Sequence, residues 1–241
     1  MKLQSSYRMK YTIDKAKNRI REFIYKRYNI SFSQGGGDDI QLNKLIKAEN
    51  QGVYVDIGCW HPVKASNTYY FYLRGWKGIC IDPNPELKSL YDKYRPKDNF
   101  INCAIGPENK NLTYYQLNDN YSTMNTLNYD FIKKHNLENQ IKSTINVPIY
   151  NLKDILDKTI LEGERLDFFD IDVEGFDLEV LKSNEWNKYR PKVILIETDL
   201  SIQNDINSEI VQYLKSVDYR LIAKSIINGD LGNLFLIDNQ K

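Results

Sequence analysis

The sequence predicts a single α/β domain built on a mostly parallel β-sheet, and three observations support this fold class. Short apolar runs alternate with helix-like segments from residue 53 onward. Most runs end in a polar tip before the chain returns through a helix, which is the pattern of parallel βαβ units. The 241 residues are 41% hydrophobic and include no low-complexity tract, so the chain can bury one full core.

The first 32 residues are predicted to form a basic helical extension, and residues 33–241 the main domain. Residues 1–30 hold nine Lys or Arg side chains and two acidic ones, a net charge of +7, which leaves −6 for the remainder of a chain with net charge +1. Apolar side chains recur there at helical spacing, at Ile13, Ala16, Ile20, Phe23 and Ile24. We favour packing of this helix on the domain, with peripheral contact to a membrane surface or an acidic glycan as the alternative.

The remaining elements follow in order. A glycine-rich break, SFSQGGGDD, ends in two aspartates that are expected to cap a helix at residues 40–49. Further helices are expected at residues 67–73, 86–94, 178–186 and 206–216. Strands are predicted by their β-branched and aromatic content at VYVDIG, GICID, FINCAIG, LTYYQL, INVPIYNL, LDFFDID, KVILIETD, YRLIAKS and LFLID. The last two strands should form a hairpin around Asn228 and Gly229.

Composition excludes several kinds of protein. Two histidines and three cysteines provide no HExxH, no CxxC and no disulfide framework, so Cys59, Cys80 and Cys103 are interpreted as reduced core thiols. A net charge of +1 argues against a nucleic-acid partner. No run approaches eighteen consecutive apolar residues and no signal peptide is evident, so we expect a cytoplasmic protein.

Carboxylates stand at the ends of four predicted strands. Because ligands of an open α/β sheet bind at the carboxyl ends of its strands, these acids should converge on one crevice. Such a crevice suits a ligand with hydroxyl groups and positive charge, and it suits an anionic phosphate poorly. The acids are Asp56, Asp82, Asp170 with Asp172, and Glu197 with Asp199.

The first of these strand ends indicates a nucleoside cofactor without phosphates. VDIG begins like a dinucleotide fingerprint, but the second and third glycines are missing after Gly58. Asp82 lies 24 residues further on, at the tip of the next strand, where a carboxylate binds a ribose diol. S-adenosylmethionine fits, because Asp56 and the acidic rim would stabilise its sulfonium and ammonium groups.

Other functions remain open at this level. Asp170-Ile171-Asp172 is a DxD, with which many glycosyltransferases hold a divalent ion and a nucleotide sugar. A non-catalytic binding protein with the same fold is a further alternative. Tyr129 and Lys133 form a YxxxK, but the glycine-rich turn that a reductase needs is absent.

Six blocks in order, SQGGGDD, GVYVDIGCWHP, SNTYYFYLRGWKGICIDPNP, NFINCAIG, LDFFDIDVEGFDLEVL and VILIETD, resemble the FkbM family of S-adenosylmethionine-dependent methyltransferases. The resemblance implies a Rossmann-like class I methyltransferase fold, with a mostly parallel seven-stranded sheet and helices on both faces. It also implies O-methylation of a sugar hydroxyl, in a nucleotide sugar or in a surface or capsular polysaccharide precursor.

The resemblance also assigns the site. Asp56 and Gly58 match the first cofactor motif, Asp82 the ribose acid, and Cys103 with Ala104 the wall of the adenine pocket. Asp172, Glu174 and Gly175 match the IDVEG block at the mouth of the site. The chain departs from the family at Gly36-Gly37-Asp38, where relatives often have Gly-Glu-Asp, and at Asp170, where many have Lys or Ser. The expected cofactor contacts are completed by Gln34, Asn67, Pro83 and Asp170.

Methyl transfer requires positioning and removal of the acceptor proton. The candidate bases are Asp172, which a strand tip holds rigidly, Glu174 and His61. A divalent ion held by Asp172 with Glu197, which would lower the pKa of the acceptor hydroxyl, is the alternative.

Overall fold

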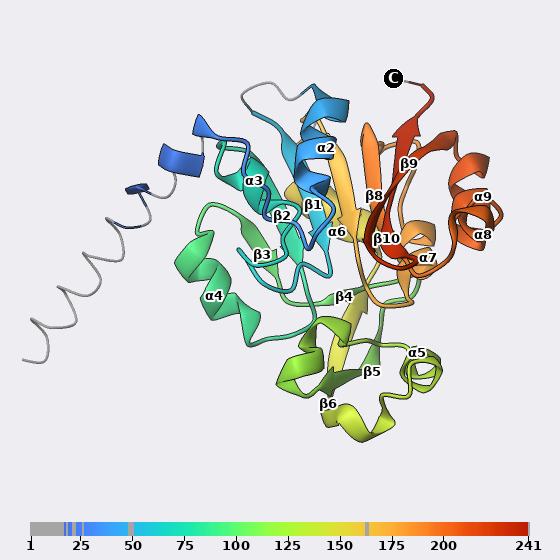
Figure 1. Ribbon diagram of the computed structural model, residues 1–241. Coiled ribbons are helices and arrows are strands. Elements are labelled where there is room, and N and C mark those ends of the chain that lie inside the picture. The colour runs from blue at the N-terminus through green and yellow to red at the C-terminus, as the bar shows by residue number, and fades with distance from the viewer. Residues whose placement is uncertain are drawn as a thin grey trace, which may run out of the picture.

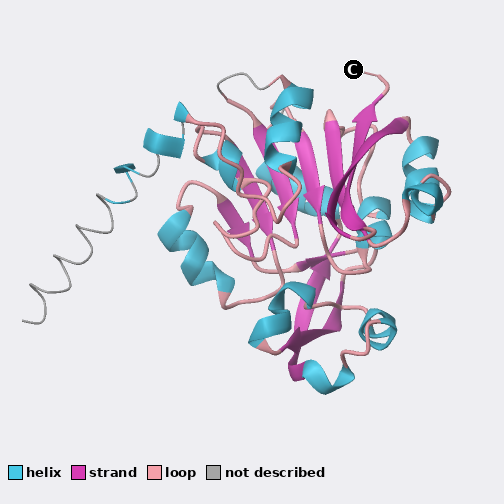
Figure 2. Cartoon of the chain, viewed as in Figure 1, coloured by secondary structure: helices cyan, strands magenta, loops and turns pink. Residues whose placement is uncertain are grey.

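A computed structural model of the chain describes residues 27–47, 51–161 and 164–240, together with Lys17, Arg19, Ile20 and residues 23–25. These residues form two β-sheets, with helices packed around the larger one (Figure 1 and Figure 2). None of the helices described is both long and apolar enough to cross a membrane.

The larger sheet has seven strands in the order β3-β2-β1-β7-β8-β10-β9. Five neighbouring strands, β3, β2, β1, β7 and β8, are parallel, whereas β10 runs antiparallel to both of its neighbours. This is the mostly parallel class I arrangement that the family resemblance predicts. The strands are β1 (Val53–Ile57), β2 (Lys77–Ile81), β3 (Asn99–Ile101), β7 (Phe168–Ile171), β8 (Val193–Thr198), β9 (Tyr219–Asn228) and β10 (Leu231–Asp238).

Helices cover both faces of this sheet. One face packs against α2 (Asp38–Ile46), α3 (Tyr69–Tyr72) and α4 (Leu87–Tyr94). The other packs against α6 (Leu152–Thr159), α7 (Asp177–Lys182) and α9 (Glu209–Ser216), and the short α8 (Ile202–Asp205) precedes α9. Successive side chains of β7 alternate between the two faces, so that Phe168 joins one core and Phe169 the other. Because both faces are buried, the parallel strands are continuous apolar runs in the sequence.

A second sheet of three strands lies below the main sheet in Figure 1, in the order β4-β6-β5. Its strands are β4 (Ala104–Ile105), β5 (Lys110–Leu117) and β6 (Ile141–Tyr150); η1 (Asp119–Met124), α5 (Tyr129–Lys134) and η2 (Glu138–Gln140) connect the last two. The connection contacts the turn that follows β7: Thr126 Oγ1 donates to the Glu174 carbonyl at 2.8 Å, and Asn128 Nδ2 to the Gly175 carbonyl at 2.9 Å. This small sheet therefore closes one side of the carboxyl edge of the main sheet.

Several sequence predictions need correction. FINCAIG is divided between β3 and β4, which belong to different sheets. Gly37 occupies the N-cap position of α2, so Asp38 and Asp39 do not cap it; both are buried, and Asp39 accepts the backbone N–H of Phe32 instead. The hairpin at Asn228 is confirmed, with Gly229 at a φ of +58°.

The basic extension differs from the favoured interpretation at two of its described apolar residues. Ile20 is 62% exposed and Phe23 is 67% exposed, so packing of the apolar stripe on the domain is wrong for these two residues. Tyr25 does contact the body of the domain, edge to face with Phe32 at 4.9 Å. Ile13 and Ala16 lie outside the described residues, and the boundary at residue 33 stays a prediction.

Candidate active site

Two adjoining hollows lie at the carboxyl ends of the parallel strands. The first lies between the ends of β1, β2 and β4 and the connection from η1 to α5. The second is larger and extends toward the ends of β7 and β8. Both are lined by Gly58, Trp60, Thr123 and Asp172, so they form one continuous crevice.

Gly58 allows the turn after β1 to approach β7. Its φ is +83°, and a Cβ atom at this position would lie 1.7 Å from the backbone oxygen of Asp172. The two strand ends are also joined directly, because the Asp172 N–H donates to the Ile57 carbonyl at 3.0 Å. A glycine is required here for backbone packing as well as for the left-handed conformation.

Asp82 stands at the end of β2 and holds the loops on either side of it. Its Oδ2 accepts the Trp60 N–H at 3.0 Å, and its Oδ1 accepts the Asn84 N–H at 2.8 Å. Burial raises the pKa of this carboxyl to about 7, against the lowering effect of those two hydrogen bonds. Asp82 lines the first hollow, and each of its oxygens has a second lone pair, so the group can accept further hydrogen bonds from a ligand.

Pro83, Cys103 and Ala104 line the apolar end of the first hollow. Cys103 and Ala104 are buried, and burial raises the pKa of the Cys103 thiol to about 12, which is consistent with an inert core thiol. Tyr114 and Phe176 complete the wall; the sequence analysis did not single them out. Tyr114 lies in a strand of the second sheet, whose position no local pattern indicates.

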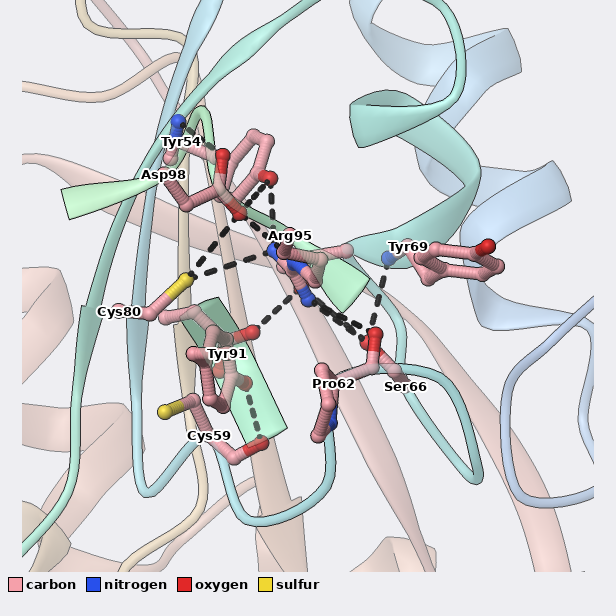
Figure 3. A network of polar contacts seen from close by, with 12 residues as sticks. Tyr54, Cys59, Pro62, Ser66, Tyr69, Cys80, Tyr91, Arg95 and Asp98 are labelled. Atoms are coloured by element: carbon pink, nitrogen blue, oxygen red, sulfur yellow. Dashed lines mark hydrogen bonds and ion pairs between the residues drawn. The ribbon is translucent and has the colours of Figure 1, made fainter. Parts of the chain in front are cut away.

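Asp56, at the carboxyl end of β1, is linked through Thr68 to Arg95, which is the centre of the buried polar network in Figure 3. Thr68 Oγ1 donates to Asp56 Oδ2 and accepts from Arg95 Nη1 at 3.0 Å. Burial raises the pKa of Asp56 to about 6, and the Arg95 guanidinium opposes that rise. Arg95 is therefore the positive charge that favours an ionised Asp56.

The Arg95 guanidinium is fully buried. Its Nε donates to Asp98 Oδ2 at 2.6 Å and its Nη2 to the Tyr54 hydroxyl at 2.6 Å, while Nη1 also reaches Ser66 Oγ at 3.3 Å and the Pro62 carbonyl at 3.5 Å (Figure 3). Arg95 thus joins the loop after β1 to the end of α4. The sequence analysis missed it, because KYRPKD has the composition of a solvated helix end.

The other predicted cofactor contacts, Gln34, Asn67 and Asp170, line the second hollow, and we call the part at Asn67 and the buried Asp170 its inner part; Gln34 is exposed. Asn67 Nδ2 donates to Asp170 Oδ1 at 3.1 Å. Burial, and next the nearby charge of Asp56, raise the pKa of Asp170 well above its usual value. Asp170, the acid that departs from the family pattern, therefore lies beside Asn67, which follows the loop after β1.

Asp172, Glu174 and Glu197 lie together in the outer part of the second hollow. One carboxylate oxygen from each lies within 4.8 Å of the other two. Burial raises the pKa of all three carboxyls, and for Asp172 the charge of Glu197 is the next largest cause. A raised pKa makes the ionised carboxylate a stronger base.

His61 lines neither hollow. Its Nδ1 accepts the backbone N–H groups of Val63 and Lys64, at 3.1 and 3.0 Å, so it shapes the turn after Pro62. Burial, and then the charge of Lys64, lower the pKa of its imidazole. The structure therefore gives His61 a place in the turn, separate from Asp172 and Glu174.

Residues 50–221 match the methyltransferase FkbM domain, which covers most of the chain. The chain belongs to the FkbM methyltransferase family. It is therefore an S-adenosylmethionine-dependent methyltransferase. This family assignment argues against the glycosyltransferase and binding-protein alternatives.

Solved structures were compared as well. The TrmK of M. capricolum, in complex with S-adenosylhomocysteine, has a TM-score of 0.44 and 16% identity, over 83% of this chain and 68% of that one. The 1,6-didemethyltoxoflavin-N1-methyltransferase of Burkholderia thailandensis has a TM-score of 0.44 and 9% identity, over 95% and 88%. The precorrin-6y C5,15-methyltransferase of Geobacter metallireducens has a TM-score of 0.44 and 8% identity, over 83% and 86%. No curated protein matches the sequence.

The crevice of this FkbM methyltransferase fits its cofactor. An apolar slot ends at a carboxylate that can accept hydroxyl groups, and acidic side chains continue from there along the second hollow. S-adenosylmethionine has the same sequence of groups, an adenine, a ribose diol and a positively charged methionine.

Proposed function

We propose that this methyltransferase transfers a methyl group to a hydroxyl oxygen of a carbohydrate. The observation that carries the proposal is the second hollow, which is lined by seven carboxylates among the described residues and adjoins the first hollow. Carboxylates accept hydrogen bonds from the several hydroxyl groups of a sugar, and one of them can take the proton of the reacting hydroxyl.

The cofactor supplies, when bound, a methyl group on a positively charged sulfur. In the proposal Asp82 accepts the ribose hydroxyls, and Pro83, Cys103 and Ala104 enclose the adenine. The positively charged methionine portion lies along Asp56 and the inner part of the second hollow, with Gln34, Asn67 and Asp170. The positive charge of this portion is what makes an acidic wall favourable there.

Asp172 is the proposed general base. It lines both hollows, so it stands between the cofactor and the acceptor. The backbone of Asp172 is held by its hydrogen bond to the Ile57 carbonyl and by contact with Gly58. Its side chain is therefore positioned more rigidly than the side chain of a loop residue would be. Glu174 lies beside it as an alternative acceptor of the proton.

The same hollow bears on the choice of acceptor. Its basic side chains are Lys134 and His135, and Lys134 Nζ already lies 2.5 Å from Asp199 Oδ2. A phosphate group in this hollow would face uncompensated carboxylates, which disfavours a nucleic acid. A glycan hydroxyl remote from any phosphate, in a polysaccharide precursor or at the far end of a nucleotide sugar, avoids that repulsion.

The test uses labelled S-adenosylmethionine with a panel of glycosides, nucleotide sugars and RNA. We expect label on oxygen of a sugar, and Asp172→Asn should reduce turnover by ~10²-fold or more while it leaves cofactor affinity nearly unchanged. Asp92→Asn, which removes an exposed carboxylate of α4, is the matched control. Methylation of RNA alone, or of nitrogen or carbon alone, would refute the proposal, and full turnover by the Asp172 variant would place the base elsewhere.

A further inference from the structure

Asp172, Glu174 and Glu197, hereafter the outer triad, offer three oxygen ligands from two strand ends and one turn. We propose that the outer triad binds a divalent cation of the Mg²⁺ or Mn²⁺ class at the point where the acceptor enters. One oxygen of each carboxylate lies within 4.8 Å of the others, a spacing that a single ion can bridge with small rotations of the side chains. Binding of the ion is independent of the proposed acceptor.

A separate observation points to a missing ligand. Asp172 keeps some exposed surface, but its Oδ1 atom is buried and accepts no N–H or O–H donor of the described residues, and the side chain that Asp172 does meet is another carboxyl, that of Glu197. A buried carboxylate oxygen without a partner is unfavourable by the full cost of its lost hydration. A cation at the triad would supply that partner.

The charged side chains around the outer triad do not supply a partner for Asp172 Oδ1. Asp177, the nearest further acid, has its two oxygens occupied by the backbone N–H groups of Val173 and Gly175. The lysine that lines the hollow, Lys134, is paired with Asp199 at the rim.

The backbone holds the three ligands at a fixed separation. Asp172 is tied to β1 through Ile57, and Glu197 lies on β8, which pairs with β10. Glu174 has a φ of +53°, an unusual conformation for glutamate, and its carbonyl accepts the Thr126 hydroxyl. A preformed set of ligands reduces the ordering that metal binding would otherwise require.

The donor set decides the class of metal. Three carboxylates with no thiolate or imidazole in the set favour hard, oxygen-preferring cations over Zn²⁺ or Cu²⁺. Three protein ligands leave coordination positions for water or for hydroxyl oxygens of an acceptor. The outer triad is thus a site at which two neighbouring hydroxyl groups of a sugar could bind together.

The catalytic consequence rests on the proposed function. A hydroxyl group bound to the cation has a lower pKa, so it gives its proton to water more readily. Its oxygen then forms the bond to the methyl carbon as the bond from that carbon to sulfur breaks, and the positively charged sulfonium becomes a neutral thioether. In this arrangement Asp172 would act as a ligand, and the cation with water would take over the removal of the proton that is otherwise assigned to Asp172 as general base. A vicinal diol would be the favoured acceptor.

Mn²⁺ alone is the probe. The full chain, stripped with EDTA and desalted, is titrated with MnCl₂, and free Mn²⁺ is followed by electron paramagnetic resonance. We expect one site in the wild type, at least tenfold weaker binding in both Glu197→Gln and Glu174→Gln, and no change in Asp92→Asn. Circular dichroism and calorimetric binding of S-adenosylmethionine show that each variant is folded.

The outcomes separate this proposal from the proposed function. Absence of Mn²⁺ binding at millimolar concentrations, or equal binding by the wild type and both folded triad variants, would overturn the metal site. Methylation of a sugar at the same rate in EDTA and in MgCl₂ would overturn the role in catalysis and leave the methyltransferase assignment intact. A chain that binds Mn²⁺ at the triad but methylates no carbohydrate would keep the site and refute the acceptor.

Discussion

Replacement of Arg95 by methionine should destabilise the fold. Methionine fills much of the same space but leaves the Asp98 carboxylate, which is fully buried, without its cation. Loss of one partner of a buried ion pair costs about 3 to 5 kcal/mol. Asp98 would still accept the Tyr54 hydroxyl at 2.9 Å and the Gly78 N–H at 3.1 Å, which favours the smaller value. A loss of about 3 kcal/mol lowers the melting temperature of a domain of this size by about 6 to 12 °C.

The same replacement should weaken cofactor binding in a pH-dependent way. Burial raises the pKa of Asp56, and Arg95 opposes that rise. The nearby acids Asp98 and Asp170 repel the negative charge of Asp56. Without Arg95 the pKa of Asp56 rises further, so a larger fraction of the carboxyl is protonated near pH 7. We expect S-adenosylmethionine affinity to fall by ~10-fold at about pH 7 and by a smaller factor at about pH 8.5, where Asp56 ionises again.

Calorimetric titration and thermal unfolding of the full chain measure both effects. Arg95→Lys keeps a positive charge but loses the planar fork, so it should lie between the wild type and Arg95→Met. Arg74→Met removes an arginine that stacks on Tyr70, away from Asp56, and serves as the control. A melting temperature of Arg95→Met within about 2 °C of the wild type would refute the stability reasoning. Equal losses of affinity at both pH values would refute the link to Asp56.

Three further predictions follow from burial and exposure. Asp82→Asn should weaken S-adenosylmethionine binding by about 1.5 to 3 kcal/mol in calorimetry, since a charge-assisted hydrogen bond is lost, and unchanged affinity would sink its assignment to the ribose. Burial raises the pKa of Asp82 and of Glu197 to about 7, so the stability they contribute is complete below their unfolded pKa values near 4 and is lost as the pH rises through about 7. The ligand-free chain should therefore melt at a higher temperature at about pH 5 than at about pH 8, and the reverse order would contradict these directions. Deletion of residues 1–24 should change the melting temperature by less than about 2 °C because Ile20 and Phe23 are exposed, whereas a fall above about 4 °C would restore the packing interpretation.

The sequence predicted the main sheet because its information is local. Runs such as VYVDI and VILIET are apolar except for the polar residues near their carboxyl ends, and burial on both faces requires that composition. The second sheet was not predicted, since β4 contributes only Ala104 and Ile105 and its partner β6 lies about forty residues later. The polar stretch between β5 and β6 contains short helices whose turns carry no strong hydrophobic period.

The site divides in the same way. Carboxylates at strand ends could be found from the sequence, because parallel strands bring their ends to one edge. Their surroundings could not, since they depend on partners that are distant in the chain: Arg95 reaches Tyr54 across 41 positions, and Asn67 reaches Asp170 across 103. His61 shows the opposite limit. Its ordinary pKa makes it an attractive base in the sequence, but its hydrogen bonds with two nearby backbone N–H groups are what fix its position.

Negative charge is balanced in different ways at the two ends of the acidic crevice. This difference predicts which ligand needs a cation in order to bind. At the inner end, Arg95 is part of the fold and favours an ionised Asp56 whether or not a ligand is present. At the outer end the triad has no such cation among the described residues, and Asp172 Oδ1 is left without a partner. The cofactor end is therefore preformed, whereas the acceptor end gains its charge balance from what binds there. S-adenosylmethionine affinity should accordingly be the same in EDTA and in MgCl₂ to within about twofold, and a strong dependence on Mg²⁺ would mean that the two ends are not electrostatically separate.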